Sequence, residues 1–446
     1  MTTELAKGRS VMASEAEVFE RANWKPIQLL VLGLCFLINM LDGMDLLVIS
    51  YAAPVLSTEW KVDPASLGLL LSVAFPGMAI GGMVLAPLAD RFGRRPLIVG
   101  ALAFSSLAML ASGMAGTLSE LLVLRLLVGI GIGVLLPTMS AMISEFAPRR
   151  FRDFGVGFIL SGVPLGSTVT GFVAASSIPA FGWQATLWGA GLVSAAVTLP
   201  VALLLPESMQ FLIRRQPPNA LRRLNAVRTR LGEAALGAMP APIDQVGRGP
   251  VAALFADGRS PRTLFLWVAI SFGFMTLYFV LTWLPKLATM SGLAVRDAIY
   301  VGAIQNVGSF LGTTAVGVAA TKFPLRRLVP SFLVISVLTL VVFGNISMPL
   351  PLLLFIGFLI GFFLQGGINS LYPLGAAAYP AESRSTGLGW ATGIGRIGAI
   401  SGPILAGMFV AAGVSLGTIF IIFCVPILIA ALCAAFISSE EDAGTL

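Results

Sequence analysis

The chain has 446 residues, of which 57% are hydrophobic and only 11% are charged. Such an apolar composition excludes an ordinary soluble protein and indicates many membrane crossings. Histidine is absent, and Cys35, Cys424 and Cys433 lie in apolar runs without the spacing of metal ligands. We therefore expect no histidine-based catalysis, no metal site and no bound cofactor. An enzyme is not expected either, because no cluster of nucleophile and base is visible.

Apolar runs of about 20 residues, the length that a helix needs to cross a bilayer, recur along the whole chain. They predict an all-α membrane protein with twelve transmembrane helices. The helices are expected at residues 27–56, 66–88, 96–116, 119–143, 153–177, 183–205, 263–290, 296–320, 328–347, 350–373, 386–411 and 414–437. Long unbroken runs argue against a transmembrane β-barrel. The first residues lack a cleavable signal pattern, so we expect the first span to stay in the mature protein.

The connections between these spans differ in charge. Basic residues gather in the N-terminal segment and in every second connection, among them Lys7, Arg9, Arg21, Lys25, Arg149, Arg150, Arg152, Lys322, Arg326 and Arg327. The positive-inside rule then places both termini and the central polar stretch in the cytoplasm of a multi-pass protein of the cell (inner) membrane. The basic residues behind the net charge of +7 are distributed over the loops of one membrane side and do not form a single basic surface. No nucleic-acid partner is therefore expected.

The only long polar segment inside the chain divides it in two. We expect a cytoplasmic N-terminal segment at 1–26, a six-helix half at 27–205, a cytoplasmic linker at 206–262, a second six-helix half at 263–437 and a cytoplasmic tail at 438–446. Within the linker, residues 219–231 place leucine and valine on one stripe and arginine mostly opposite. This pattern predicts an amphipathic helix on the cytoplasmic membrane surface. We expect the protein to be a monomer.

The two halves are internal repeats. At an offset of about 232 residues, several residues of the first half recur in the second, namely Pro148 and Pro380, Arg152 and Arg384, Gly129 and Gly361, Gly155 and Gly387, Gly157 and Gly389, and Gly166 and Gly398. Two parallel six-helix repeats, with a substrate site between them near the membrane midplane, are a transporter architecture.

The connection after the second span combines one acid, one glycine and three arginines. These residues are Asp90, Arg91, Gly93, Arg94 and Arg95. The glycine permits a tight turn, and the charges can form a network that breaks when the two halves rock. Glu145, at the inner end of the fourth span, can join this gate or simply be solvated among loop arginines. The connection strongly resembles the signature loop of the major facilitator superfamily, which implies the fold of that family and a gating role for these residues.

A narrower resemblance rests on stretches in both halves. These are Asp42-Gly43-Met44-Asp45 with Pro54, Pro206-Glu207-Ser208, Tyr278 to Pro285, Tyr379-Pro380 and Arg384 to Gly398. The chain resembles the aromatic acid:proton symporter family of that superfamily. The resemblance implies proton-coupled uptake of a small aromatic carboxylate, of benzoate or hydroxybenzoate type, by alternating access.

Other substrates and the opposite direction are alternatives. Porters of sugars and organic ions share Pro206-Glu207-Ser208, so a symporter of a sugar or another organic acid is the first alternative. Proton-driven export of metabolites or drugs is the second. Exporters often carry a Gly-Pro motif in the fifth span, where this chain has the broken version Gly162-Val163-Pro164. This difference favours uptake.

Charges inside the predicted spans define the candidate site. Asp42 and Asp45 lie in the first span, Arg125 in the fourth and Arg396 in the eleventh, at compatible depths. They can form a buried structural ion pair, or they can bind a ligand, since a guanidinium holds a carboxylate through two hydrogen bonds. We expect Arg396 or Arg125 to bind the substrate anion and Asp42 or Asp45 to exchange the coupling proton.

Aromatic and amide side chains of the presumed cavity helices are expected to complete a substrate pocket. The candidates are Tyr278, Trp283, Gln305, Asn306, Gln365, Asn369, Tyr372 and Trp390. Any one of the aromatic residues can instead be a packing residue or an anchor at the membrane interface.

Overall fold

A computed structural model describes residues 24–241, 251–256 and 258–437, and all regular secondary structure in these residues is helical. The N-terminal half contains α2 (Pro26–Glu59), α3 (Pro64–Ser72), α4 (Ala74–Ile80), η1 (Gly81–Leu85), η2 (Ala86–Leu88), α5 (Ala89–Phe92), α6 (Arg94–Ser112), α7 (Leu118–Phe146), η3 (Arg149–Phe151), α8 (Arg152–Leu160) and α9 (Gly162–Leu204). The linker contains α10 (Met209–Arg215), α11 (Ala220–Leu231) and η4 (Val251–Leu254).

The C-terminal half contains α12 (Ser260–Met290), α13 (Val295–Ala319), α14 (Leu325–Asn345), α15 (Leu350–Ile360), η5 (Gly361–Gln365), α16 (Gly366–Asn369), α17 (Leu371–Ala377), α18 (Ala381–Ala411) and α19 (Leu416–Phe436). Most of the predicted N-terminal segment, with Lys7, Arg9 and Arg21, and the predicted tail at 438–446 lie outside the described residues.

Ten helical segments in the described residues are long and apolar enough to cross a membrane, where the sequence predicts twelve. The difference arises in two places. Residues Phe154–Leu204 form one run of 51 residues, which contains the predicted helices 153–177 and 183–205 and changes direction at Gly182, where φ is 81°. The predicted helix 296–320 corresponds to α13, which carries more polar residues and is not among the ten. The prediction of an all-α membrane protein is confirmed.

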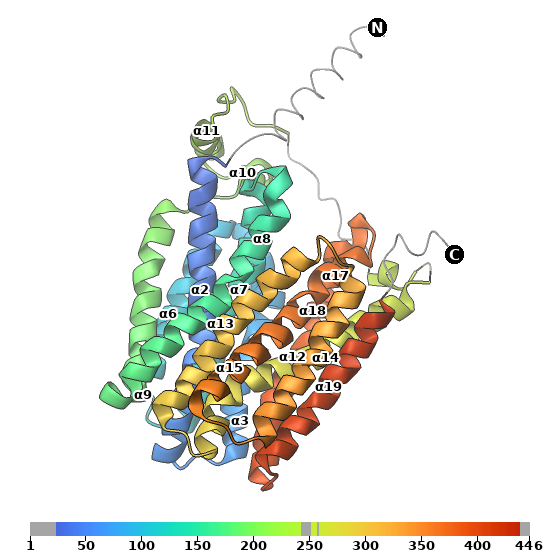
Figure 1. The fold of residues 1–446 in the computed structure, drawn as a ribbon. Coiled ribbons are helices and arrows are strands. Elements are labelled where there is room, and N and C mark those ends of the chain that lie inside the picture. Colours follow the sequence, from blue (N-terminus) through green and yellow to red (C-terminus); the bar gives the residue numbers. More distant parts are fainter. Residues whose placement is uncertain (1–23, 242–250, 257, 438–446) are drawn as a thin grey trace.

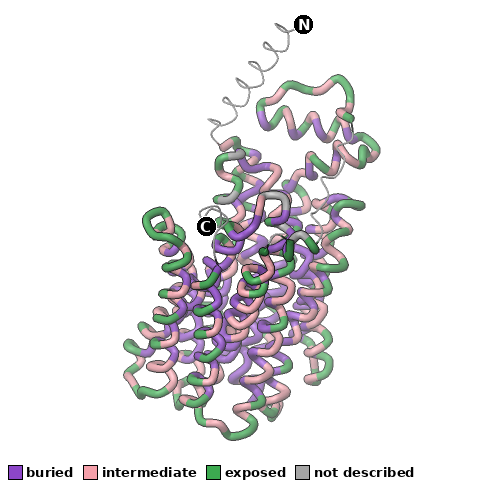
Figure 2. The backbone as a smooth tube through the Cα atoms, turned by 90° about the vertical axis from the view of Figure 1, so that its right-hand side faces the viewer, coloured by how far each residue is buried: buried purple, intermediate pink, exposed green. Residues whose placement is uncertain are grey.

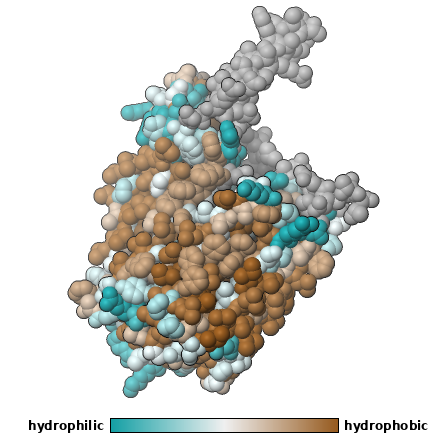
Figure 3. Space-filling view, in the orientation of Figure 1, coloured by the Kyte–Doolittle hydropathy of each residue, from teal (hydrophilic) through white to brown (hydrophobic). Residues whose placement is uncertain are grey.

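The surface of the molecule matches a bilayer. Apolar side chains cover its middle, and polar side chains gather toward the end that carries α10 and α11 and toward the opposite end (Figure 3). Leu107, Leu203 and Leu338 are examples of large apolar side chains that are mostly exposed. Buried residues lie in the interior of the helix bundle (Figure 2). Lipid is the solvent that such a belt requires.

The helices form two bundles in sequence order, one from the N-terminal and one from the C-terminal half (Figure 1). The same close contacts hold each bundle together. A side chain at Gly81 would collide with the carbonyl of Ile130, and a side chain at Gly312 would collide with the carbonyl of Phe362. Three further contacts of the first half recur in the second. Gly77 packs on Leu126 as Gly308 packs on Phe358, Gly129 packs on Ala74 as Gly361 packs on Gln305, and Gly166 packs on Met40 as Gly398 packs on Ser271. The repeat found in the sequence is therefore a repeat of helix packing.

The two bundles touch at the end opposite the linker helices. Ser50 Oγ on α2 donates a hydrogen bond of 2.7 Å to the carbonyl of Thr282 on α12, a residue 232 positions later in the chain. Lys286 Nζ on α12 donates to Ser57 Oγ on α2 at 2.7 Å. Ser50 Oγ also lies 3.1 Å from the carbonyl of Leu281, so α2 and α12 pack directly against each other where the halves meet.

The linker helix α11 is amphipathic, as the sequence predicts. Its apolar residues Leu224, Val227 and Leu231 are buried inside the protein, where they pack on α10 and on the beginning of α2. The expectation that this stripe rests on lipid is therefore wrong. The stripe instead fixes the linker to the N-terminal half.

Candidate functional site

Asp42 and Asp45 lie inside the protein on α2. Their exposed fractions are 5% and 3%, and Oδ1 of each carboxylate has no hydrogen-bond partner in the described part of the chain. Gly43 lets α2 approach α9 next to these acids, since a side chain there would collide with the backbone of Val163. A buried charged group without a partner costs at least about 1–3 kcal/mol, so this arrangement is unfavourable unless a ligand or a proton compensates it.

Asp45 belongs to the interior of the N-terminal half. Arg125 on α7 is fully buried and donates from Nη2 to the backbone carbonyl of Asp45 at 2.5 Å and from Nη1 to Met109 Sδ at 3.6 Å. Electrostatic attraction acts between Arg125 and Asp45, and Ser194 lies beside the carboxylate. These residues all come from one half, so Arg125 connects α2, α6 and α7 within that half.

Asp42 instead faces the C-terminal half. Arg396 on α18 interacts electrostatically with Asp42, and its Nη1 reaches Met78 Sδ on α4 at 3.6 Å. The Arg396 guanidinium also lies within hydrogen-bonding reach of the Tyr278 hydroxyl on α12. Arg396 is only half-buried. It is therefore a cation from one half that meets an acid and a thioether from the other.

Two aromatic rings pack on Tyr278, which interacts with this cation. The rings of Phe75 and Tyr278 come from opposite halves, with centroids 4.4 Å apart, and Phe274 packs on Tyr278 edge-on at 5.5 Å. We call Asp42, Phe75, Met78, Tyr278 and Arg396 the central cluster. Rings beside a guanidinium provide apolar surface for an aromatic ring and hydrogen bonds for a carboxylate.

The two candidate ion pairs do not form as direct contacts. Among the residues that the structure describes, no arginine or lysine nitrogen lies within 4.0 Å of a carboxylate oxygen of Asp42 or Asp45. A purely structural ion pair between an aspartate and Arg125 is therefore not formed, because Arg125 donates its hydrogen bond to a backbone carbonyl instead. Of the two arginines, only Arg396 lies where the halves meet.

The predicted amides form hydrogen bonds within their own half, and Asn306 also bonds to the N-terminal half. Gln305 Nε2 donates to Ser309 Oγ at 3.0 Å, and Asn306 Nδ2 donates to the carbonyl of Gly302 at 2.9 Å and to Tyr51 Oη at 3.4 Å. On the neighbouring helices, Gln365 Nε2 donates to Asn369 Oδ1 at 3.4 Å, and Asn369 Nδ2 donates to Thr313 Oγ1 at 3.0 Å. None of the hydrogen bonds found for these four amides in the described residues reaches the central cluster.

The predicted aromatic residues Tyr372 and Trp390 have different surroundings. Tyr372 interacts electrostatically with Tyr278 and Arg396, so it lies next to the central cluster. Trp390 is 46% exposed and stacks on Trp267 with ring centroids 6.2 Å apart. Phe75 and Met78 also belong to the cluster but cannot be predicted from the sequence, because an apolar residue in an apolar helix gives no signal.

The predicted gate is built around Glu145 and Glu207. Arg94 forms an ion pair with Glu145, and Ser208 Oγ donates to Glu145 at 2.7 Å. One oxygen of Glu207 accepts from the backbone N–H groups of Arg94, Arg95 and Ser208 at 2.9, 3.1 and 2.9 Å. We call Arg94, Glu145, Glu207 and Ser208 the polar latch. Asp90 and Arg91 are exposed, and the Asp90 carbonyl accepts from Arg215 Nε at 3.0 Å.

Gly93 makes the polar latch possible. Its φ of 103° lies in a region that L side chains rarely adopt, and a Cβ at this position would lie 2.6 Å from Glu207 Oε2. All members of the latch belong to the N-terminal half or to the linker. In this structure the latch therefore ties α6, α7 and α10 together and does not join the two halves, which differs from the expected network between them.

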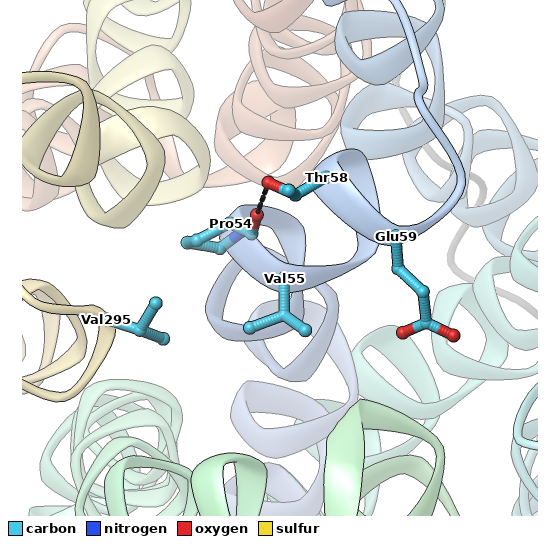
Figure 4. Close-up of a pocket in the computed structure, with 5 residues that line it drawn as sticks. All are labelled: Pro54, Val55, Thr58, Glu59 and Val295. Carbon is cyan, nitrogen blue, oxygen red and sulfur yellow. Dashed lines mark hydrogen bonds between the residues drawn. The ribbon is translucent and has the colours of Figure 1, made fainter.

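A pocket at the end opposite the linker contains none of the predicted site residues. Pro54, Val55, Thr58 and Glu59 of α2 and Val295 of α13 line it (Figure 4). Thr58 Oγ1 donates to the Pro54 carbonyl at 3.0 Å, and Glu59 accepts from Trp183 Nε1 at 2.9 Å. Because these polar groups already have partners, the pocket lacks the unpaired charge that the central cluster offers.

The chain is similar to curated transport proteins over most of its length. The 4-hydroxybenzoate transporter of Pseudomonas putida is 35% identical over 379 residues, which cover 83% of this chain and 84% of the relative. The gallate transporter of Pseudomonas putida is 33% identical over 409 residues and covers 91% and 90%. The benzoate transport protein of Acinetobacter baylyi is 28% identical over 404 residues and covers 88% and 85%.

Solved structures show the same fold. A bacterial homologue of the human lysosomal transporter Spinster, in an inward-facing conformation, gives a TM-score of 0.70 at 18% identity and covers 93% of this chain and 97% of that one. The inward-open xylose transporter of E. coli gives 0.67 at 19% identity, with the same coverage. The family model of the Major Facilitator Superfamily matches residues 35–343. The chain therefore belongs to the major facilitator superfamily, a family of membrane transporters and not of enzymes.

Proposed function

We propose that this protein is a proton-coupled symporter that takes up small aromatic carboxylates of the benzoate or hydroxybenzoate type. The observation that carries the proposal is the position of Arg396, which is half-buried where the two halves meet, between Asp42 and the rings of Phe75 and Tyr278. The relatives named as transporters of 4-hydroxybenzoate, gallate and benzoate support this substrate class.

Arg396 binds the substrate carboxylate in this proposal. A guanidinium can donate two parallel hydrogen bonds to a carboxylate, and the neighbouring rings provide stacking surface for the substrate ring. Arg125 does not bind substrate, because its hydrogen bonds and its burial keep it inside the N-terminal half.

Asp42 carries the coupling proton. Without substrate, its negative charge is balanced by Arg396 nearby. A bound carboxylate takes over the guanidinium and places a second negative charge beside Asp42, so uptake of a proton by Asp42 restores the charge balance. Substrate and proton therefore load together, as symport requires. Asp45, beside Arg125, supports the fold of the same helix face.

The chain crosses the inner membrane twelve times and works as a monomer with both termini in the cytoplasm. Support for twelve spans comes from the break at Gly182 and from the 25 residues of α13, which together add two helices to the ten apolar segments. Support for the orientation comes from Arg94 and Arg95, which contact Glu207 at the beginning of the linker, and from the arginines of the linker itself. Alternating access then consists of one half rocking against the other around the central cluster.

Transport by purified protein in liposomes tests this proposal. With an inward-directed proton gradient, we expect accumulation of benzoate and 4-hydroxybenzoate that a protonophore abolishes, and no accumulation of succinate or xylose. Accumulation of succinate or xylose without either aromatic acid would overturn the assigned substrate class. Accumulation of the aromatic acids that ignores the proton gradient would overturn the coupling.

A further inference from the structure

Tyr278 lies where the two halves meet, and two other rings hold it there. Its side chain is half-buried on α12. The centroid of its ring lies 4.4 Å from that of Phe75, which belongs to the N-terminal half, and 5.5 Å from that of Phe274 on the same helix. Contacts with two rings restrict the few torsions of a tyrosine side chain. The Tyr278 hydroxyl therefore has a defined position although the side chain is only partly enclosed.

This hydroxyl accepts a hydrogen bond from Arg396. A guanidinium has five N–H donors and no acceptor, so the oxygen of Tyr278 is the acceptor of the pair. Arg396 Nη1 also reaches Met78 Sδ at 3.6 Å, and a thioether is a weak acceptor. Both partners are neutral, and no carboxylate oxygen of the described residues lies within 4.0 Å of the guanidinium. Tyr278 thus positions the cation without neutralising its charge.

The hydroxyl proton of Tyr278 remains available for a ligand. The contact with Arg396 does not use this proton, because a guanidinium cannot accept a hydrogen bond. Asp42 is near enough to interact electrostatically with Tyr278, yet the described residues show no hydrogen bond from the hydroxyl to that carboxylate. A free O–H donor beside a cation is an arrangement that suits a carboxylate.

Tyr372, the other phenol near Arg396, has already used its proton. Its hydroxyl forms a hydrogen bond with Thr392 on α18. Thr392 Oγ1 donates its own proton to the carbonyl of Leu388 at 2.8 Å, so Tyr372 is the donor toward Thr392. The two phenols therefore differ, since Tyr372 bonds within the C-terminal half and Tyr278 keeps a donor at the boundary of the halves.

A carboxylate bound to Arg396 can use both kinds of donor. Its two oxygens have about four acceptor positions, so two hydrogen bonds from the guanidinium leave room for one from a phenol. We propose that Tyr278 is part of the anion site, where it positions Arg396 and donates its hydroxyl proton in a further hydrogen bond to the substrate carboxylate. This inference rests on the proposed function and names a second group that recognises the carboxylate.

A double-mutant cycle with Arg396 tests this role. Calorimetry measures the dissociation constant of benzoate for the wild type, Tyr278→Phe, Arg396→Lys and the double variant. Phenylalanine keeps the ring that packs on Phe75, and we expect Tyr278→Phe to bind benzoate at least about tenfold more weakly, as for the loss of a hydrogen bond to a charged group. Because Tyr278 acts partly through Arg396, the loss in the double variant should be clearly smaller than the product of the two single losses.

Two further tyrosines provide matched comparisons. Tyr300 Oη accepts from Arg296 Nη2 at 3.3 Å at the beginning of α13, so Tyr300→Phe breaks the same kind of pair elsewhere and should bind benzoate as the wild type does. Tyr372→Phe removes a hydroxyl whose proton is already used, and it should weaken binding less than Tyr278→Phe does. Without ligand, Tyr278→Phe and Tyr300→Phe should unfold at similar temperatures, whereas benzoate should raise the unfolding temperature of Tyr278→Phe less.

The possible results separate the role of Tyr278 from the proposed function. Wild-type affinity in Tyr278→Phe, single losses that simply multiply in the double variant, or a larger loss in Tyr372→Phe would each overturn the role of Tyr278 while the aromatic acid site stands. A wild type that binds neither benzoate nor 4-hydroxybenzoate would overturn the proposed function itself.

Discussion

Arg125 donates its hydrogen bond to the backbone carbonyl of Asp45, at 2.5 Å, whereas Arg396 lies at the boundary of the halves and faces Asp42. The two intramembrane arginines therefore have different surroundings. One is enclosed in a single half and the other is accessible to a ligand that binds between the halves. This difference predicts that substitutions of the two residues have different consequences.

Arg125→Met should impair folding rather than substrate recognition. Removing the guanidinium leaves the buried Asp45 carbonyl without its hydrogen bond and the nearby carboxylate without its cation, and one buried unsatisfied group costs about 1–3 kcal/mol. Thermal unfolding of the detergent-solubilised protein should occur at a clearly lower temperature. The double variant Asp45→Asn with Arg125→Met should recover part of this loss, because the uncompensated charge is gone. Independent, additive losses in the double variant would contradict the coupling of the two residues.

Arg396→Lys should impair ligand binding rather than folding. A lysine keeps the positive charge but cannot form the two parallel hydrogen bonds of a guanidinium, so we expect the affinity for benzoate-type acids to fall at least about tenfold, or about 1.4 kcal/mol. Calorimetry and the ligand-induced rise in unfolding temperature measure this loss. Arg125→Lys is the matched comparison. An unchanged affinity in Arg396→Lys would place the carboxylate site elsewhere.

Asp42→Asn should separate transport from proton coupling. The amide has nearly the same shape but cannot take up and release a proton, so accumulation against a gradient should disappear while exchange of labelled for unlabelled substrate continues. Glu120→Gln is a control because Glu120 is an exposed acid at the beginning of α7 that accepts from the Gly116 N–H at 2.9 Å. Gradient-driven accumulation at the wild-type level in Asp42→Asn would exclude Asp42 as the proton carrier.

The sequence allows the membrane class, the helix positions and the repeat to be predicted because these depend on local composition. Apolar runs of bilayer length leave few alternatives, and glycines such as Gly129 and Gly361 recur because the same helix crossings occur in both halves. The count of spans was less well determined. The break at Gly182 has no polar loop to mark the boundary between two spans, and α13 is more polar than most spans. Both features make separate spans harder to count.

The composition of the site could be predicted only in part. A charge in an apolar span is conspicuous, so Asp42 and Arg396 were found from the sequence. Gln305 and Asn306 look equally conspicuous, yet their hydrogen bonds to Ser309 and Gly302 lie within the same helix, which no composition rule reveals. Conversely, Phe75 is an ordinary apolar residue until the two halves bring it to Tyr278.

Gly93→Ala should weaken the polar latch. An alanine at a φ of 103° is strained, by about 1–3 kcal/mol for comparable residues, and its Cβ would displace the Glu207 carboxylate that holds the N–H groups of Arg94 and Arg95. We expect a lower unfolding temperature together with easier proteolysis of the linker, since Glu207 and Ser208 begin it. Gly100→Ala is the matched control, because Gly100 is helical and a Cβ there meets nothing within 4 Å. Equal behaviour of the two variants would mean that the turn at Gly93 does not hold the latch together.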